Sequence, residues 1–438
     1  MNQNFMKSKL PKVYNRNFQN AYLDPIREKL IYVTPEETVR QHVISYLLKN
    51  LKVPKNLICV EEPLKHYGIK TKDRADIIID SYDEETEKYY PLAVIECKAP
   101  EIYLDDYAHK QMFGYAEKLG CDYCVLTNGE ETFCFYNGEK IDELPTYEEM
   151  LQGKYSLAPV EEPEPRLSFD ELETEYQKYF YREKQPQIGD STPEEFSIPL
   201  ANFVECLLDT SHKMPEKNYK IFRLIEDYGI RDFTTGASAG FGKASGQYRS
   251  FLVEYNGNAT FVSISTTNYF DGRKTCIFVA VDTDEGKPHR SLSMDIDNFC
   301  EVRELPKNIS DAEVEEKLNA YIATLPPKPT GSNLVSLYRR IQWEKEVKNF
   351  EHKLKFNPPQ FVLYHNGKIT SGDKGALKVD GLRKIVAEKY PEIIDGKNFY
   401  LGTLTHDRLW YLDDEEVMKV VENLISYALI RDDYRAMF

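Results

Sequence analysis

Two strand-like segments in the N-terminal third carry an Asp, a Glu and a Lys whose types and spacing suit metal-assisted hydrolysis. Asp76 lies in RADIIIDSY (74–82), and Glu96 and Lys98 lie in PLAVIECKA (91–99). Residues two apart in a β-strand project from the same face, so Glu96 and Lys98 point the same way. Asp76 approaches Glu96 if the two strands pair. Two carboxylates at a strand end form an oxygen-rich site of the kind that binds Mg²⁺.

This combination of groups suits the hydrolysis of a phosphodiester. A bound Mg²⁺ polarises a phosphoryl oxygen and lowers the pKa of its bound water. A lysine two residues along can position or deprotonate that water, or stabilise the charge on the pentavalent phosphate. The Glu-x-Lys spacing alone is not specific, because it recurs at Glu285, Glu315, Glu346 and Glu351. The alternative interpretation of the Glu96 copy is a charged strand end with a surface ion pair.

The first 150 residues contain the elements that must position these groups. A helix is predicted over about 35–51, because Thr34 is a favourable N-cap, Pro35 occupies the first helical position and Glu37 completes a capping box. A second helix is predicted over about 104–119. Strand-like runs lie at 57–64, 74–82, 91–99, 122–128 and 131–137. The order is helix, three strands, helix, two strands.

The segment TPEETVRQ…RADIII…AVIECKAP…QMFGY…CVLTNG resembles the N-terminal nuclease domain of type I restriction enzyme R subunits, which belongs to the PD-(D/E)xK superfamily. The resemblance covers roughly residues 20–145, and its five blocks occur in the family's order. It implies an α/β, restriction-endonuclease-like fold with a mixed central sheet flanked by helices. It also implies Mg²⁺-dependent cleavage of DNA, with Mn²⁺ as a substitute, and other restriction or defence subunits as partners.

The resemblance also implies roles for particular residues. Asp76 and Glu96 match the family's metal ligands, and Lys98 matches its catalytic lysine. The peptide carbonyl of Cys97 is the usual extra metal ligand in such sites. Glu37 matches the helix acid that often joins the metal site, although its place in the capping box explains it equally well.

Three further residues match accessory positions. Gln111 and Tyr115 match the family's Gln-x-x-x-Tyr motif and, one helical turn apart, share a face that can look at the active site. The alternative is a buried Gln–Tyr hydrogen bond. Arg40 matches the family's first helix, and its guanidinium is expected to contact a phosphate or to pair with a strand carboxylate. Arg74 adds a basic residue near the same cleft.

The chain is expected to contain several parts. We predict a tail at 1–20, the nuclease-like domain at 21–150, an acidic linker with one short helix at 151–192, an α+β domain at 193–327 and a mostly helical region at 328–438. The C-terminal half is thus α+β and resembles no family that we can name.

An R subunit also carries an ATP-driven translocase, and nothing in this sequence matches a phosphate-binding P-loop. The nearest segment, GASAGFGKAS (236–245), has Ala244 where the motif has Ser or Thr. The leading hypothesis is therefore a Mg²⁺-dependent DNA endonuclease without a translocase. The alternatives are a catalytically weak nucleic-acid-binding or assembly module, and a nuclease subunit that a separate partner activates.

The composition is compatible with these functions. The 438 residues carry a net charge of −16, which argues against a nucleic-acid partner, but the basic residues cluster in 49–74 beside Asp76. The run 338–355 is also basic and is predicted to be a helix whose face is either solvated or in contact with DNA. No apolar run reaches the 18 residues of a membrane span, and the N-terminus lacks a signal-peptide pattern. A cytoplasmic location with reduced cysteines is expected.

Overall fold

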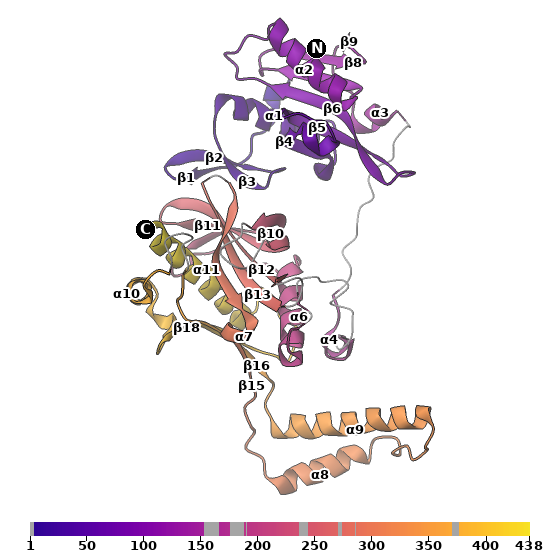
Figure 1. Cartoon of the computed structure of the whole chain (residues 1–438), viewed down its shortest axis with the longest axis vertical. Coiled ribbons are helices and arrows are strands. Elements are labelled where there is room, and N and C mark those ends of the chain that lie inside the picture. The colour runs from indigo at the N-terminus through magenta and orange to yellow at the C-terminus, as the bar shows by residue number, and fades with distance from the viewer. Residues whose placement is uncertain are drawn as a thin grey trace. The chain divides into compact units, whose positions relative to one another are not determined.

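The chain forms two compact units that divide near residue 165 and are described separately. A computed structural model describes residues 4–152, 166–175, 188–189, 191–235, 244–269, 274–284, 286–369 and 376–438. Figure 1 shows the arrangement of the helices and strands within each unit. No helix among these residues is long and apolar enough to cross a membrane.

The first unit is built around a six-stranded mixed sheet in the order β4-β5-β6-β7-β8-β9. β6 and β7 are parallel, and the other neighbours are antiparallel. The strands are β4 (Ile58–Pro63), β5 (Arg74–Asp83), β6 (Lys88–Cys97), β7 (Tyr123–Thr127), β8 (Thr132–Tyr136) and β9 (Glu139–Ile141). This mixed sheet confirms the predicted restriction-endonuclease-like α/β class for the N-terminal part of the chain.

One helix covers each face of this sheet. Helix α1 (Pro35–Lys49) contributes Val39, Val43 and Leu47 to one core, which contains the β5 side chains Ile77 and Ile79. Helix α2 (Asp106–Leu119) contributes Met112 to a second core, which contains the intervening Ile78 and, from β6, Val94. The alternation of side chains along β5 and β6 therefore fixes which residues face each helix. Helix α3 (Tyr147–Leu151) packs into the α1 core.

A small antiparallel sheet precedes α1. Its strands are β1 (Val13–Arg16), β2 (Gln19–Asp24) and β3 (Lys29–Tyr32), and a short 3₁₀ turn, η1 (Phe5–Lys7), places Phe5 in the α1 core. Much of the segment that we expected to be a tail, 1–20, is therefore structured. At the start of α1, Thr34 Oγ1 accepts the Glu37 N–H as expected, but the Glu37 carboxylate bonds to other side chains instead of completing a capping box.

The second unit contains two antiparallel sheets. The first is a five-stranded meander of β10 (Arg223–Thr235), β11 (Ala244–Tyr255), β12 (Asn258–Tyr269), β13 (Lys274–Asp282) and β14 (Pro288–Asp295). The second has the order β15-β16-β18-β17, with β15 (Cys300–Arg303), β16 (Gln360–His365), β17 (Ile394–Asp395) and β18 (Asn398–Thr405). Its helices are α4 (Phe169–Glu175), α6 (Glu194–Leu208), α7 (Ile296–Phe299), α8 (Asp311–Ile322), α9 (Leu334–Lys355), α10 (Val379–Lys389) and α11 (Glu415–Ala436).

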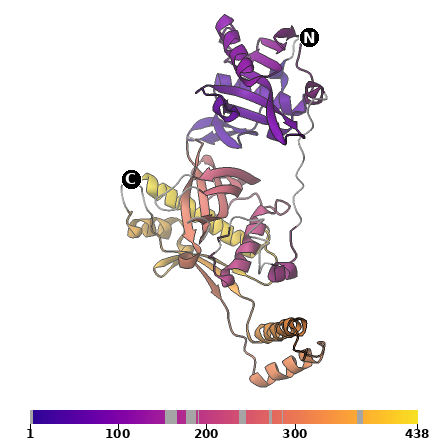
Figure 2. The same ribbon diagram turned by 45° about the vertical axis from the view of Figure 1, so that its right-hand side comes forward.

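A single core joins the two sheets with α6, α10 and α11, whereas α8 and α9, which are fully described, contribute no side chain to it. Phe251 and Val279 of the meander belong to the same buried cluster as Leu363, Trp410 and Leu424. Figure 2 shows α11 lying along the meander. The C-terminal half is α+β, as predicted, but the expected boundary between 327 and 328 does not separate two cores. Most of the glycine-rich segment at 236–245 lies outside the described residues.

Candidate active site

The pairing of β5 with β6 brings Asp76 and Glu96 together. Ile77 lies opposite Ile95 in this antiparallel pair, so the next residues, Asp76 and Glu96, are neighbours where the pairing ends. The N–H of Cys97 donates to Asp76 Oδ2 over 2.7 Å. β6 ends at Cys97, so Lys98 immediately follows the strand and lies beside both carboxylates.

Lys98 links the strand to helix α2. Its Nζ atom donates to Glu96 Oε1 over 2.7 Å and to Gln111 Oε1 over 3.2 Å, and Gln111 Nε2 donates to Tyr115 Oη over 3.1 Å. The spacing of four residues in α2 puts Gln111 and Tyr115 on the same helix face. The Gln–Tyr hydrogen bond expected as the alternative for this motif is present. Gln111 also accepts from Lys98, so the same helix face contacts the candidate active site.

The charges of the site perturb one another. Burial, and after it the charge of Asp76, raises the pKa of Glu96 from its ordinary value of 4.5 to about 7. Burial alone lowers the pKa of Lys98, but its hydrogen bond to Glu96 and the nearby carboxylates outweigh burial, so this pKa is raised. Glu96 Oε2 is buried and has no hydrogen-bond partner. A buried carboxylate oxygen without a partner is costly unless a cation or a proton satisfies it.

Replacement of Glu96 by Gln is expected to stabilise the metal-free protein at neutral and alkaline pH. A raised carboxyl pKa means that ionisation of Glu96 opposes folding. The contribution of Glu96 to the free energy of unfolding is therefore fully present below the pKa that this carboxyl has in the unfolded chain, and it is lost as the pH rises through about 7. The variant should gain on the order of 1–3 kcal/mol at pH 8 and almost nothing near pH 4. Scanning calorimetry in EDTA at the two pH values measures this difference. Equal gains at both pH values would contradict the assignment of the shift to Glu96.

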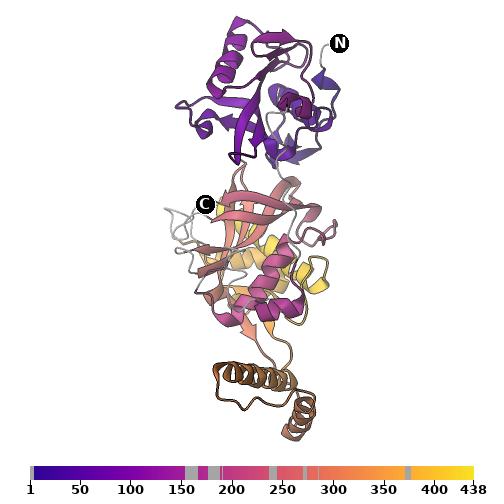
Figure 3. The same cartoon turned by 90° about the vertical axis from the view of Figure 1, so that its right-hand side faces the viewer.

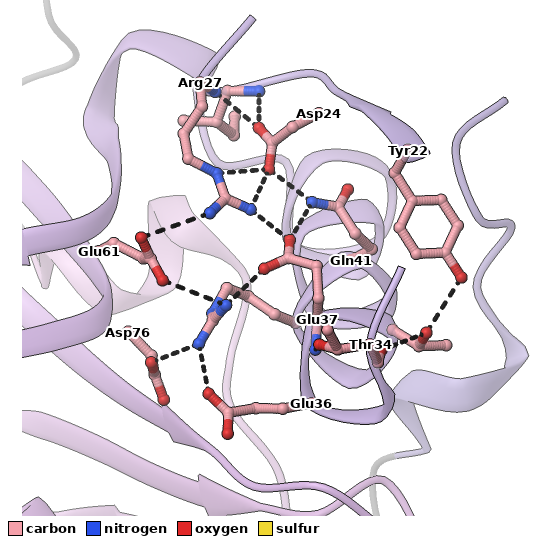
Figure 4. A network of polar contacts seen from close by, with 12 residues as sticks. Tyr22, Asp24, Arg27, Thr34, Glu36, Glu37, Gln41, Glu61 and Asp76 are labelled. Carbon is pink, nitrogen blue, oxygen red and sulfur yellow. Dashed lines mark hydrogen bonds and ion pairs between the residues drawn. The ribbon is translucent and has the colours of Figure 1, made fainter. Parts of the chain in front are cut away.

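Arg40 of α1 is the second basic residue that contacts the site carboxylates. Its Nη2 atom donates to Asp76 Oδ1 over 2.6 Å and to Glu36 Oε1 over 2.8 Å, and Glu61 Oε1 lies 3.6 Å from its Nη1 atom. Figure 4 shows these three carboxylates around one guanidinium. Burial alone lowers the pKa of Arg40, but the charges of Asp76 and Glu37 outweigh it and leave this pKa raised. Arg40 was expected to contact either a phosphate or a strand carboxylate. The structure contains the second contact, the ion pair with Asp76.

Glu37 bonds to the Nη1 atom of Arg40, whereas Asp76 bonds to the Nη2 atom of the same guanidinium. The buried Glu37 carboxylate accepts from Arg27, Arg40 and Gln41, and so takes part in the network of Figure 4. The residue that reaches the site from this helix is Glu36, which shares Arg40 Nη2 with Asp76. Sequence reasoning missed Glu36, although it stands beside Glu37 in the first turn of α1.

Two other expected positions are more peripheral. Arg74 is mostly exposed, and its Nη1 atom lies 3.4 Å from Glu61 Oε2. The thiol of Cys97 is buried, and burial raises its pKa well above the ordinary range. A neutral thiol is a poor ligand for Mg²⁺, so any contribution of Cys97 must come from its peptide carbonyl.

Asp76 and Glu96 fit a Mg²⁺ ion that keeps most of its water. No group of three or more His, Cys, Asp or Glu side chains in the described part of the chain is arranged to hold a metal ion. Mg²⁺, however, usually binds through one or two carboxylates and retains several waters. The unpartnered Oε2 atom of Glu96 would supply one oxygen ligand to such an ion, whereas both oxygens of the neighbouring Asp76 accept hydrogen bonds, from Arg40 and from the Cys97 N–H.

Comparison with known proteins identifies the segment that carries this site. No curated protein and no solved structure gives a match. A match to a family model covers residues 35–149, about a quarter of the chain, from the start of α1 into α3. It includes Asp76, Glu96, Lys98, Gln111 and Tyr115. The resemblance found in the sequence is thus confirmed, and residues 35–149 match the family described as the type I restriction enzyme R protein N terminus.

Proposed function

We propose that this chain is a Mg²⁺-dependent endonuclease that hydrolyses DNA phosphodiester bonds in restriction or defence, without an ATP-driven translocase. One observation carries the proposal: the buried Glu96 Oε2 atom lacks a partner beside Asp76 and Lys98. The family match of the surrounding segment supports a nuclease-like role related to restriction. Other restriction or defence subunits are proposed as partners for the same reason.

The residues of the site divide the work as follows. Asp76, Glu96 and the peptide carbonyl of Cys97 hold Mg²⁺, for which Mn²⁺ substitutes. The bound ion supplies Lewis-acid chemistry and an acidified water. Lys98 orients that water or stabilises the charge on the phosphate, and Gln111, itself bonded to Tyr115, keeps the ammonium group in place.

DNA binding is proposed to use one local basic surface. The basic residues between 49 and 74 all have exposed side chains: Lys49, Lys52, Lys55, Lys65, Lys70, Lys72 and Arg74. Pro63 pairs with Arg74 and Ile58 with Ile79, so the basic residues from Lys65 to Arg74 lie toward the Asp76 end of β5 and Lys55 toward the other end. In a chain with a net charge of −16, the few basic residues near Asp76 are proposed to give modest affinity that falls steeply with salt. Arg40 reaches a phosphate only if it releases Asp76, because its guanidinium now contacts that carboxylate.

A catalytically weak binding or assembly module is the second candidate. The observation that favours it is the state of Asp76, whose Oδ1 accepts from Arg40 and whose Oδ2 accepts from the Cys97 N–H. A carboxylate held on both oxygens is structurally satisfied without a metal ion. In such a module Arg40 keeps Asp76 permanently, and Mg²⁺ has no role.

Metal titration separates the two candidates. The wild-type chain is expected to bind Mn²⁺ at the Asp76–Glu96 site, with an affinity that rises as the pH increases through about 7, because Glu96 must lose its proton. Isothermal calorimetry at pH 6 and pH 8 measures this change. Glu96→Gln should abolish binding, whereas Asp83→Asn, at the far end of β5, should leave it intact. Absence of binding by the wild-type chain at both pH values would favour the second candidate.

A further inference from the structure

Two tyrosines that follow Lys98 in the chain have largely exposed side chains. Tyr103 is 78% exposed and Tyr107 76%, more than any other tyrosine in the described part of the chain. Tyr103 lies in the loop that leads from Lys98 to α2, and Tyr107 lies in the first turn of α2. Exposed aromatic rings grouped next to a candidate active site mark a surface that contacts a ligand.

The backbone that carries these two rings is held in place. Asn128 Nδ2 donates to the carbonyl of Ile102 over 2.9 Å, and Leu104 is buried in the α2 core. Asp105 caps α2, and its Oδ1 atom accepts the N–H of Tyr107 over 3.1 Å. The rings are therefore presented from a fixed frame, so little conformational entropy is lost when they bind a ligand.

Tyr107 begins a stripe of residues along α2, the helix that Figure 3 shows beside the six-stranded sheet. Intervals of four, three and four residues place the members of this stripe on one helix face: Tyr107, Gln111, Gly114 and Lys118. Gln111, in the middle of the stripe, accepts from Lys98 Nζ over 3.2 Å. At the C-terminal end, Lys118 Nζ donates over 2.6 Å to Oδ2 of Asp73, which immediately precedes β5. The stripe therefore borders the candidate active site along the length of α2.

Gly114 is a bare position in this stripe that packing does not require. It lies in the interior of α2, where glycine destabilises a helix relative to alanine. A Cβ atom at this position would meet no atom of another part of the described chain within 4 Å. A glycine without a packing cause, one turn from Gln111, leaves room for the backbone of a ligand to approach the helix closely.

We propose that the α2 stripe binds an unpaired DNA strand next to the scissile bond, with the rings of Tyr103 and Tyr107 stacked on its bases. The inference rests on the proposed nuclease function, because the stripe is continuous with that site. Aromatic side chains hold single strands by stacking on the faces of their bases, and in a duplex neighbouring base pairs cover those faces.

The dimensions of α2 fit this arrangement. The rise from Tyr107 to Gln111 is about 6 Å along the helix, which is the span of about two stacked nucleotides. The stacked bases therefore lie a few nucleotides from the scissile phosphate, and the backbone of the strand continues past Gly114. The preferred substrate is DNA with an unpaired segment beside the cut.

Binding of labelled DNA by the full-length chain in EDTA tests the proposal without requiring cleavage. Fluorescence anisotropy compares a short blunt duplex with the same duplex carrying a single-stranded thymine tail, at one salt concentration. The wild-type chain is expected to bind the tailed duplex at least about tenfold more tightly than the blunt one. The double variant Tyr103→Ala, Tyr107→Ala should lose this preference and keep its affinity for the blunt duplex.

Two control variants separate stacking from other effects. Tyr103→Phe with Tyr107→Phe should keep the preference, because phenylalanine retains the ring and lacks only the hydroxyl. Tyr89→Ala removes a tyrosine that is 51% exposed at the opposite end of β6 from Glu96, and it should have no effect. All of the replaced side chains are exposed, so circular dichroism should show the variants folded like the wild-type chain.

Gly114→Gln tests the path of the strand along α2. Because a side chain at this position has open surroundings, the variant should unfold at a temperature no lower than that of the wild-type chain. Its affinity for the tailed duplex should nevertheless fall at least about tenfold, since the new side chain obstructs the strand. An unchanged affinity would overturn the proposed path.

The outcomes distinguish this proposal from the proposed function. Equal wild-type affinity for the two duplexes would overturn the stacking surface alone, as would a loss with the Phe variant as large as that with the Ala variant. A chain that binds neither duplex would overturn both the stacking surface and the DNA partner. A chain that binds the tailed duplex more tightly but never cleaves DNA in Mg²⁺ would support the stacking surface and contradict the nuclease.

Discussion

Asp76→Asn is expected to lower the rate of Mg²⁺-dependent DNA cleavage by at least about a thousandfold. The substitution removes one of the two carboxylates that the register of β5 and β6 brings together. It keeps an oxygen that can accept the Cys97 N–H, which now donates to Asp76 Oδ2 over 2.7 Å, so the fold should survive. Lys98→Met is expected to cause a loss of similar size, because it removes the ammonium group that bonds to Glu96 over 2.7 Å.

The cleavage rates are measured on supercoiled plasmid in excess Mg²⁺. Asp83→Asn is the matched control for Asp76→Asn, because both residues belong to β5 but Asp83 lies at its far end. Lys65→Met is the control for Lys98→Met, since Lys65 is exposed. If either site variant retains more than about a tenth of the wild-type rate, the residue it replaces is not part of the catalytic machinery.

Arg249→Met is expected to destabilise the second unit by about 3–5 kcal/mol. Arg249 is fully buried, and its Nε and Nη2 atoms each donate to a different oxygen of Asp227 over 2.7 Å. Its guanidinium also donates to the carbonyls of Asp209 and His212, which follow α6. The substitution leaves Asp227 as a buried charge whose carboxylate still accepts the backbone N–H of Met214 over 2.8 Å but has lost its cationic partner.

Arg223→Met provides the matched control for this loss. Arg223 pairs with Glu254 across the same two strands, but both side chains are about half exposed, so its loss should cost no more than about 1 kcal/mol. Urea unfolding followed by tryptophan fluorescence reports on the second unit alone, because the chain's two tryptophans, Trp343 and Trp410, both belong to it. Equal destabilisation by the two variants would show that burial does not decide the strength of the pair.

The chemistry of the site could be predicted from local pattern. Glu96 and Lys98 share a face because side chains in a strand alternate, and the two β-rich segments are close enough in sequence to pair. The register that makes Asp76 a neighbour of Glu96 follows from burial of Ile77 and Ile95 on one face. A one-residue slip would have placed both isoleucines on the wrong face of the sheet.

The contacts that depend on how α1 crosses the sheet could not be predicted. Glu36 and Glu37 are adjacent, and only the position of the helix decides that Glu36 shares Arg40 Nη2 with Asp76, whereas Glu37 bonds to Arg40 Nη1 and to Arg27. The segment 1–20 contains β1 and the start of β2, and it lacks a long apolar run, so the sequence predicts a tail there. The domain boundary predicted at 327 is wrong because it rests on a turn rich in proline and glycine. That turn joins α8 to α9, and these two helices are an insertion between the paired strands β15 and β16.

Incubation of supercoiled plasmid with the wild-type chain, in Mg²⁺ without ATP, tests the central claim most directly. We expect nicked and linear DNA to accumulate with Mg²⁺ or Mn²⁺, to be absent in EDTA and to be unaffected by added ATP. Cleavage should also weaken steeply as salt increases, because a chain of net charge −16 is proposed to bind DNA through a few basic side chains. Plasmid that stays supercoiled at every concentration of Mg²⁺ and Mn²⁺ would contradict the assignment of the Asp76–Glu96–Lys98 site as a nuclease centre.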